Sequence, residues 1–309
     1  MRFGNGTIEA SSSSIFSGAN PKIGVLKLPG AIVMTRMPLT ARSRAIDAHP
    51  DDAELHVGGI MALYRRLGHA VKIISVTDGA AGHHALLPDE LRKVRAGELA
   101  GSAAVIGAAH ECLGFPDGAL TTSIEARLAI IRAIRKFAPD LLITHRTNDY
   151  HPDHRTVGQL IQDASYMVKV PLVAPDVPAL RKDPVVMFMA DFFTRPNPFR
   201  ADVVVDVSNA QDDVVRMVDN HVSQVYEWIP YVEGYAAEVP PADDAEARRA
   251  WLRGWLSRRP RALAKRHRDE LIARYGQRGS DVEYAEALEE SEYATRLTTD
   301  LRSRLFAGM

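Results

Sequence analysis

The chain has 309 residues, 46 % of them hydrophobic, and a formal net charge of −1 at pH 7. This length and composition fit one large α/β domain or a domain with an appendage, while the near-neutral charge argues against nucleic acid as the main partner. We expect no membrane span, because no run of about eighteen apolar residues occurs, and no secretory signal, because the N-terminus lacks a continuous apolar stretch. The single cysteine, Cys112, excludes an intramolecular disulfide framework and favours a reducing, cytoplasmic compartment.

Strand and helix patterns alternate along the first half of the chain. Residues 1–40 are expected to form a partly mobile N-terminal extension, in which residues 22–34 are apolar enough for a short strand or hairpin. Beyond it, apolar spacing predicts strands at 42–48, 71–77, 112–115 and 141–144, and helices at 54–67, 91–106, 124–137 and 156–164. This alternation predicts an α/β fold with a Rossmann-like, mostly parallel sheet and helices on both faces. No Gly-x-Gly-x-x-Gly follows a predicted strand, so no dinucleotide cofactor is expected.

The second half of the chain has a looser pattern. We expect strands at 185–189 and 203–207 and helices at 214–228 and 275–297. Residues 240–270 are strongly charged and carry Trp251 and Trp255, which fits a solvated helical face with a packed aromatic side or, alternatively, an oligomer interface. The expected organisation is a main domain over 41–240, completed by a charged helical segment over 241–309.

One imidazole and three carboxylates lie within six residues in the turn between the first predicted strand and helix. The sequence there is His49-Pro50-Asp51-Asp52-Ala53-Glu54. Pro50 restricts the backbone on both sides of itself, which holds the neighbouring side chains in a narrow range of directions. One Asp at a helix start is an ordinary N-cap, but adjacent carboxylates repel unless a cation lies among them.

A second His/Asp turn supplies further ligands about a hundred residues later. It runs Asn148-Asp149-Tyr150-His151-Pro152-Asp153-His154, again between a predicted strand and a predicted helix. Turns at the carboxyl ends of strands in one α/β sheet can face each other across the crevice where such sheets bind ligands. His49, Asp52 and His154 would then offer two nitrogens and an oxygen with a position left for water, which is typical of a catalytic zinc site.

The two motifs, His-Pro-Asp-Asp-x-Glu-x-x-x-Gly-Gly and His-Pro-Asp-His, resemble those of the PIG-L/LmbE-like family of zinc-dependent N-deacetylases. The resemblance covers roughly residues 41–160 and implies that His49, Asp52 and His154 bind Zn²⁺. It implies that Asp51 is the general base, that His151 stabilises the oxyanion and that Asp153 orients His151. Many relatives carry Gly-Cys where this chain has His56-Val57, so the resemblance does not define the pocket wall there.

The resemblance also implies the reaction, which is removal of an N-acetyl group from an amino sugar or glucosamine conjugate. Zinc lowers the pKa of a bound water to about 7 and polarises a carbonyl, and the same ligands accept Fe²⁺ or Co²⁺. Arg95 and Asp117 are candidates for binding substrate hydroxyls, although an intrahelical Arg–Glu pair and a turn aspartate would explain them equally well. The partners expected are a small N-acetylated amino-sugar substrate and, from family habit, further copies of the chain in a homo-oligomer.

Other interpretations remain open at this point. A metal-dependent phosphoesterase would need more carboxylates for a second metal about 4 Å away, and the sequence offers no clear second set. A binding module with a relic site would lack a ligand or the base, yet each of those positions is filled. His83 and His84 read as exposed loop residues, and His221 in a His-x-Ser-Gln segment reads as a structural residue or a further site residue.

Overall fold

A seven-stranded sheet forms the centre of the part of the chain that the computed structural model describes, residues 41–309. The predictions for residues 1–40, including the strand or hairpin at 22–34, lie outside this range. The strands are β1 (Arg42–Asp47), β2 (Ala70–Thr77), β3 (Ala109–Phe115), β4 (Leu141–Thr144), β5 (Val185–Met189), β6 (Val203–Asp206) and β7 (Ala285–Glu290). Among the described residues, no helix is long and apolar enough to cross a bilayer.

The strand order creates a crevice beside β1. The order is β3-β2-β1-β4-β5-β7-β6, and the pairings from β3 through β5 are all parallel. After β1 the chain moves outward to β2 and β3, then returns to place β4 on the other side of β1. The carboxyl ends of β1 and β4 therefore flank the point where the strand order reverses, which is where open α/β sheets bind ligands. The predicted Rossmann-like fold is confirmed.

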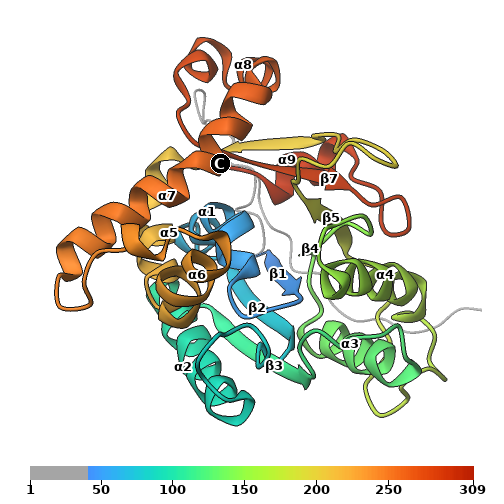
Figure 1. The fold of residues 1–309 in the computed structure, drawn as a ribbon. Helices are drawn as coiled ribbons and strands as arrows, with labels where there is room; N and C mark the ends of the chain where they lie inside the picture. The colour runs from blue at the N-terminus through green and yellow to red at the C-terminus, as the bar shows by residue number, and fades with distance from the viewer. Residues whose placement is uncertain (1–40) are drawn as a thin grey trace, which may run out of the picture. The chain divides into compact units, whose positions relative to one another are not determined.

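Helices cover both faces of the sheet (Figure 1). The apolar sides of α1 and α2 pack on the face that carries Ala45, whereas α3 and α4 pack on the face that carries Ile46. These alternating residues point to opposite faces because side chains along a strand alternate. The helices are α1 (Asp52–Arg66), α2 (Pro88–Ile106), α3 (Ile124–Phe137), α4 (Pro152–Met167), α5 (Gln211–Val218), α6 (Ile229–Glu233), α7 (Ala245–Arg266), α8 (Arg268–Tyr275) and α9 (Thr299–Leu305).

Helix α1 is interrupted one turn after the first His/Asp motif. Val57 has non-helical dihedral angles, with φ of −140°. The amides of Gly59 and Ile60 donate instead to the two carboxylate oxygens of Glu286 on β7, each at 2.8 Å. A Cβ on Gly59 would lie 2.6 Å from Val207 Cβ, so the close approach of β7 and the β6 end requires glycine there. The Gly-Gly pair thus lets the C-terminal strand hold the helix that carries Asp52.

The predicted helix over 275–297 is wrong. A short 3₁₀ segment (Gly276–Asp281) is followed by β7, which pairs antiparallel with β5 on one side and β6 on the other. The β7 sequence Ala-Glu-Ala-Leu-Glu-Glu consists of strong helix formers. Tertiary pairing with two strands overrides that local preference. Residues 241–309 therefore supply an inner strand of the central sheet as well as helices.

The predicted continuous helix over 214–228 is also wrong. Helix α5 ends at Val218, and a π-helical segment (Ser223–Trp228) then leads into α6. The π-helical turn places Ser223 against α2, where its amide and hydroxyl both donate to Glu98 at 2.7 Å. This irregularity fits the common use of π-helical turns at specialised positions.

Candidate active site

The two His/Asp turns meet at the crevice between β1 and β4. His49 and Asp52 lie in the turn from β1 into α1, and His154 lies in the first turn of α4, after β4. Pro152 occupies the first position of α4, where a missing amide hydrogen costs no helical bond. The three side chains are close although 105 residues separate His49 from His154.

The three predicted ligand side chains lie close to one another in pairs. His154 Nε2 lies 3.2 Å from His49 Nδ1 and 3.3 Å from Asp52 Oδ1, and His49 Nδ1 lies 3.2 Å from the other carboxylate oxygen of Asp52, Oδ2. Tetrahedral zinc with bonds of about 2.0–2.1 Å separates two ligand atoms by about 3.3–3.4 Å, and each of these three separations is close to that value. The donor set and its spacing therefore fit a divalent metal.

An outer carboxylate holds His154 in the tautomer that a metal ligand needs. His154 Nδ1 lies 3.0 Å from Asp149 Oδ1, which leaves Nε2 as the atom facing Asp52. Burial opposes ionisation of Asp149, but the hydrogen bond and charge of His154 and the amide of His151 together outweigh it and hold the pKa of Asp149 at about 2. Metal-binding histidines commonly donate their second nitrogen to such a carboxylate. Sequence reasoning assigned no role to Asp149, although it stands only five residues before His154.

His49 is held in the same manner from the other side. Its Nε2 lies 3.0 Å from Asp117 Oδ1 and 3.5 Å from Asp153 Oδ2. Burial opposes ionisation of Asp117, yet the contact with His49 holds the pKa of this carboxyl at about 2. The other oxygen of Asp117 accepts from the amide of Ala81 at 2.9 Å. Both carboxylate oxygens of Asp117 are thus engaged by the protein, and its predicted role in substrate binding stays a prediction.

Asp51 contacts a buried arginine and does not cap α1. Its side chain makes no capping hydrogen bond to any described amide, and Asp51 Oδ1 instead accepts from Arg95 Nη2 at 3.1 Å. Arg95 is only 2 % exposed, and its Nη1 lies 3.9 Å from Glu98. Arg95 was predicted to bind substrate; the structure places it behind Asp51, in a position to fix the direction of that carboxylate.

His151 has a defined tautomer. Its Nδ1 accepts from the backbone amide of Asp153 at 3.2 Å, so a neutral His151 carries its proton on Nε2. Burial lowers the pKa of His151, which favours this neutral form. The predicted role of Asp153 in orienting and tuning His151 stays a prediction. The Asp153 carboxylate accepts from the amides of Gly118 and Leu120, at 2.7 and 3.2 Å, and the hydrogen bond to His151 comes from the Asp153 backbone.

His145 is a buried member of the cluster that sequence reasoning missed. Its Nε2 lies 3.2 Å from Asp52 Oδ2, and its ring stacks on His154 with centroids 4.0 Å apart. Burial lowers the pKa of His145 to about 4, so the ring is neutral near pH 7. Asp52, His145 and His154 place ligand atoms within 4.8 Å of one another, as do His49, His151 and His154. The available signal was the position of His145 at the end of β4, at the same sheet edge as His49.

The remaining histidines singled out from the sequence lie outside the cluster of proposed ligands. His221 is fully buried, with its Nε2 3.3 Å from Glu54 Oε1, which fits a structural residue behind α1. His83 Nε2 lies 2.9 Å from Glu227, and His84 stacks on Tyr231 with centroids 4.0 Å apart. Both loop histidines therefore join the β2–α2 loop to the segment around α6.

Comparisons with known proteins agree with this fold and site. Residues 45–165 match the family model PIG-L, described as GlcNAc-PI de-N-acetylase. Diacetylchitobiose deacetylase of Thermococcus kodakarensis is 29 % identical over 62 % of this chain and 74 % of that protein. Two solved structures cover 84 % of the chain. The first is 4-carboxy-2-hydroxymuconate hydratase from Pseudomonas putida, of which 98 % is covered, with 16 % identity and a TM-score of 0.66. The second is N,N′-diacetylchitobiose deacetylase from Pyrococcus horikoshii, of which 88 % is covered, with 21 % identity and a TM-score of 0.61.

The fold and the His/Asp centre define an α/β protein with a site able to hold a metal at the switch point of a Rossmann-like sheet. Residues 45–165 match the PIG-L family model, which confirms the resemblance drawn from the two motifs. This segment contains both His/Asp turns, whereas α5 to α9 and β5 to β7 lie beyond it. The solved structures have less than 25 % identity to the chain and establish the fold alone.

Proposed function

We propose that the chain is a metal-dependent N-deacetylase that removes an acetyl group from an amino sugar or a glucosamine-type conjugate. The observation that carries this proposal is the cluster of His49, Asp52 and His154, together with the adjacent Asp51, whose carboxylate makes no helix-capping hydrogen bond to a described amide. The matched family model and the diacetylchitobiose deacetylase relative support the amide as the bond that is cleaved.

His49, Asp52 and His154 would hold the metal, for which we propose Zn²⁺. A divalent metal supplies Lewis acidity to a carbonyl oxygen and lowers the pKa of water. Asp51 would take a proton from the attacking water and return it to the departing amine, since an amine leaves far more readily when protonated. Arg95 would hold the Asp51 carboxylate in a fixed direction, through the hydrogen bond at 3.1 Å.

His151 would stabilise the charge that develops on the amide oxygen. The amide of Asp153 occupies His151 Nδ1, so the Nε2–H group of the neutral ring is available as a donor. A donor that is already oriented costs no reorganisation when charge develops in the transition state. His49 and His151 lie edge to face with ring centroids 4.6 Å apart, which places this donor beside the proposed ligands.

The fold by itself does not select amide hydrolysis, because one of the similar structures is a hydratase. The test is therefore a product assay on the zinc-loaded protein with a set of N-acetylated amino-sugar conjugates, including diacetylchitobiose. The proposal predicts free amine and acetate in equal amounts from at least one conjugate. A fully metallated protein that releases no amine from any of them would overturn it.

Two further expectations belong with this proposal. A reducing, cytoplasmic setting suits the single cysteine of the sequence. A homo-oligomer follows from family habit, and light scattering of the purified protein across a concentration range tests it. A molecular mass of one chain at the highest concentration would contradict the oligomer.

A further inference from the structure

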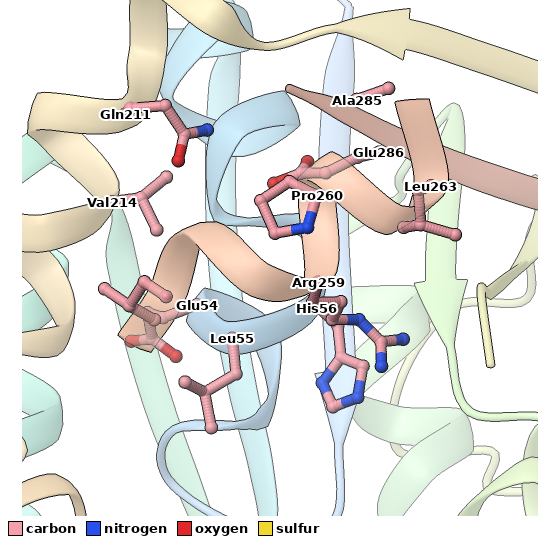
Figure 2. A pocket seen from close by; sticks show the side chains of 11 residues that line it. Glu54, Leu55, His56, Gln211, Val214, Arg259, Pro260, Leu263, Ala285 and Glu286 are labelled. Carbon is pink, nitrogen blue, oxygen red and sulfur yellow. The ribbon is translucent and has the colours of Figure 1, made fainter. Parts of the chain in front are cut away.

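Arg259 brings a cationic group to the neighbourhood of the site from outside the matched family segment. It lies on α7, nearly a hundred residues beyond residue 165, and is followed by Pro260, which lies inside the helix. Figure 2 shows Arg259 of α7 and His56 of α1 among the side chains that line one pocket. Both side chains are partly exposed.

The guanidinium is held in place without a carboxylate partner. One Nη atom donates to the carbonyl of Ala190, and the group lies over the Phe192 ring, 5.5 Å from its centroid. Its Nε is buried and has no hydrogen-bond partner among residues 41–309. Arg253 and Arg261 on the same helix, by contrast, pair with Asp212 and Glu283. A buried donor without a partner is costly, so such a group is a candidate for binding a ligand.

The carboxylates that lie around Arg259 are each engaged by other groups. Asp191 accepts twice from Arg146 Nη1 at 3.1 Å, and Glu286 accepts from two amides of α1. Asp149 is in contact with His154. These three carboxylates act on Arg259 only at longer range, and burial lowers the pKa of Arg259 despite them. The positive charge of Arg259 therefore has no dedicated partner in the described chain.

His56 connects Arg259 to the proposed metal ligands. His56 Nδ1 lies 2.8 Å from the backbone carbonyl of Asp52, and the His56 ring lies edge to face with His145 at 6.1 Å. A cavity of about 20 Å³ lies between α1, α7 and β7 and is lined by both His56 and Arg259. This volume holds about one water, so a larger anionic group would have to approach Arg259 from its exposed side.

We propose that Arg259 is a specificity-determining residue that binds an anionic substituent of the substrate, a carboxylate, beside the acetamide that is cleaved. The substrate class is thereby narrowed from amino sugars in general to acidic amino-sugar conjugates. A guanidinium whose orientation is already fixed suits this task, because it binds a carboxylate through two parallel hydrogen bonds and loses little entropy on doing so. This inference rests on the proposed deacetylase function.

The experiment compares N-acetylmuramic acid with N-acetylglucosamine, two acetamido sugars that differ in a lactyl carboxylate. The metal-loaded wild type is expected to have the higher kcat/KM on the acidic sugar. In Arg259→Gln the value for the acidic sugar should fall about 10- to 100-fold, the range that hydrogen bonds to charged groups contribute, with the neutral sugar unaffected. Arg258→Gln removes the same charge from the exposed neighbouring position and should leave both values unchanged.

Arg259→Lys is the control for misfolding, because it keeps the charge and loses only the paired hydrogen bonds. It should retain part of the preference for the acidic sugar. Equal losses on both sugars in Arg259→Gln, the same loss in Arg258→Gln, or no preference in the wild type would each overturn the proposal. Calorimetric measurement of N-acetylmuramic acid binding tests the anion site at Arg259 separately from the deacetylase function. If no amine is released from either sugar, binding that is weaker only in the Arg259 variants still supports an anion site, and equal binding refutes it.

Discussion

At the scale of single residues, Asp149 shows how the site depends on groups that touch no metal. Its carboxylate lies 3.0 Å from His154 Nδ1 and also accepts from the amide of His151 at 3.0 Å. Asp149→Asn should weaken metal affinity about 10- to 100-fold, as losing an outer hydrogen-bond partner typically does. Competition with a chromogenic chelator measures this directly. Asp176→Asn, which removes an exposed carboxylate paired with Arg132, is the control and should bind metal like the wild type.

The proposed ligands could be named from the sequence, but the groups that orient them could not. His49, Asp52 and His154 stand in short motifs after predicted strands, so chain order alone brings them to one sheet edge. Asp117 reaches His49 from the loop after β3, and that contact depends on side-chain directions in two separate loops. Arg95 likewise could be placed on a helix, whereas its contact with Asp51 depends on how α2 packs against α1.

At the scale of elements, the interrupted helix α1 depends on glycine at position 59. Gly59→Ala would place a methyl group 2.6 Å from Val207 Cβ and 2.8 Å from Glu286, and such overpacking costs about 1–3 kcal/mol of unfolding free energy. Gly97 is an exposed glycine of α2, and a Cβ added there would meet no atom within 4 Å, so Gly97→Ala should stabilise by about 0.5–1 kcal/mol. Urea unfolding of both variants tests this contrast, and similar destabilisation by the two would contradict it.

The Glu286 carboxylate gives the β7–α1 contact a pH dependence. Burial raises the pKa of Glu286 to about 7, against the amides of Ile60 and Gly59, which favour the charged form. A raised folded-state pKa means that the folded protein binds this proton more tightly than the unfolded chain. The contribution of Glu286 to the unfolding free energy is therefore complete below its ordinary pKa of 4.5 and is lost as the pH rises through 7. This loss amounts to at most about 3 kcal/mol.

Glu286→Gln tests this contribution, because glutamine does not titrate. The wild type should lose more unfolding free energy between pH 5 and 8 than the variant does, as measured by urea unfolding at several pH values. The glutamine side chain has only one acceptor oxygen, so it should leave one amide of α1 without a partner and lower stability at every pH by about 1–3 kcal/mol. Parallel pH profiles for the two proteins would show that Glu286 does not titrate in this range.

At the scale of the whole molecule, strand–helix alternation was sufficient to predict the parallel half of the sheet. Strands β1 to β5 alternate with, or follow, amphipathic helices, and β4 and β5 each carry a buried apolar run. The antiparallel half could not be predicted, because β7 consists of helix-forming residues and becomes a strand only between β5 and β6. The same strand supplies Glu286 to α1, so the C-terminal region supports the site that the first half of the chain forms.

The proposed mechanism joins a metal site with a separate base in this crevice, and Asp51→Asn distinguishes the two roles. Asparagine caps helices about as well as aspartate, and Asp51 makes no side-chain cap here in the described structure. We expect unchanged zinc content and a kcat about 10²- to 10⁴-fold lower, which is the usual contribution of general acid–base catalysis. Metal content and turnover are measured on the same preparation. A zinc-loaded Asp51→Asn protein with near wild-type turnover would exclude Asp51 as the base.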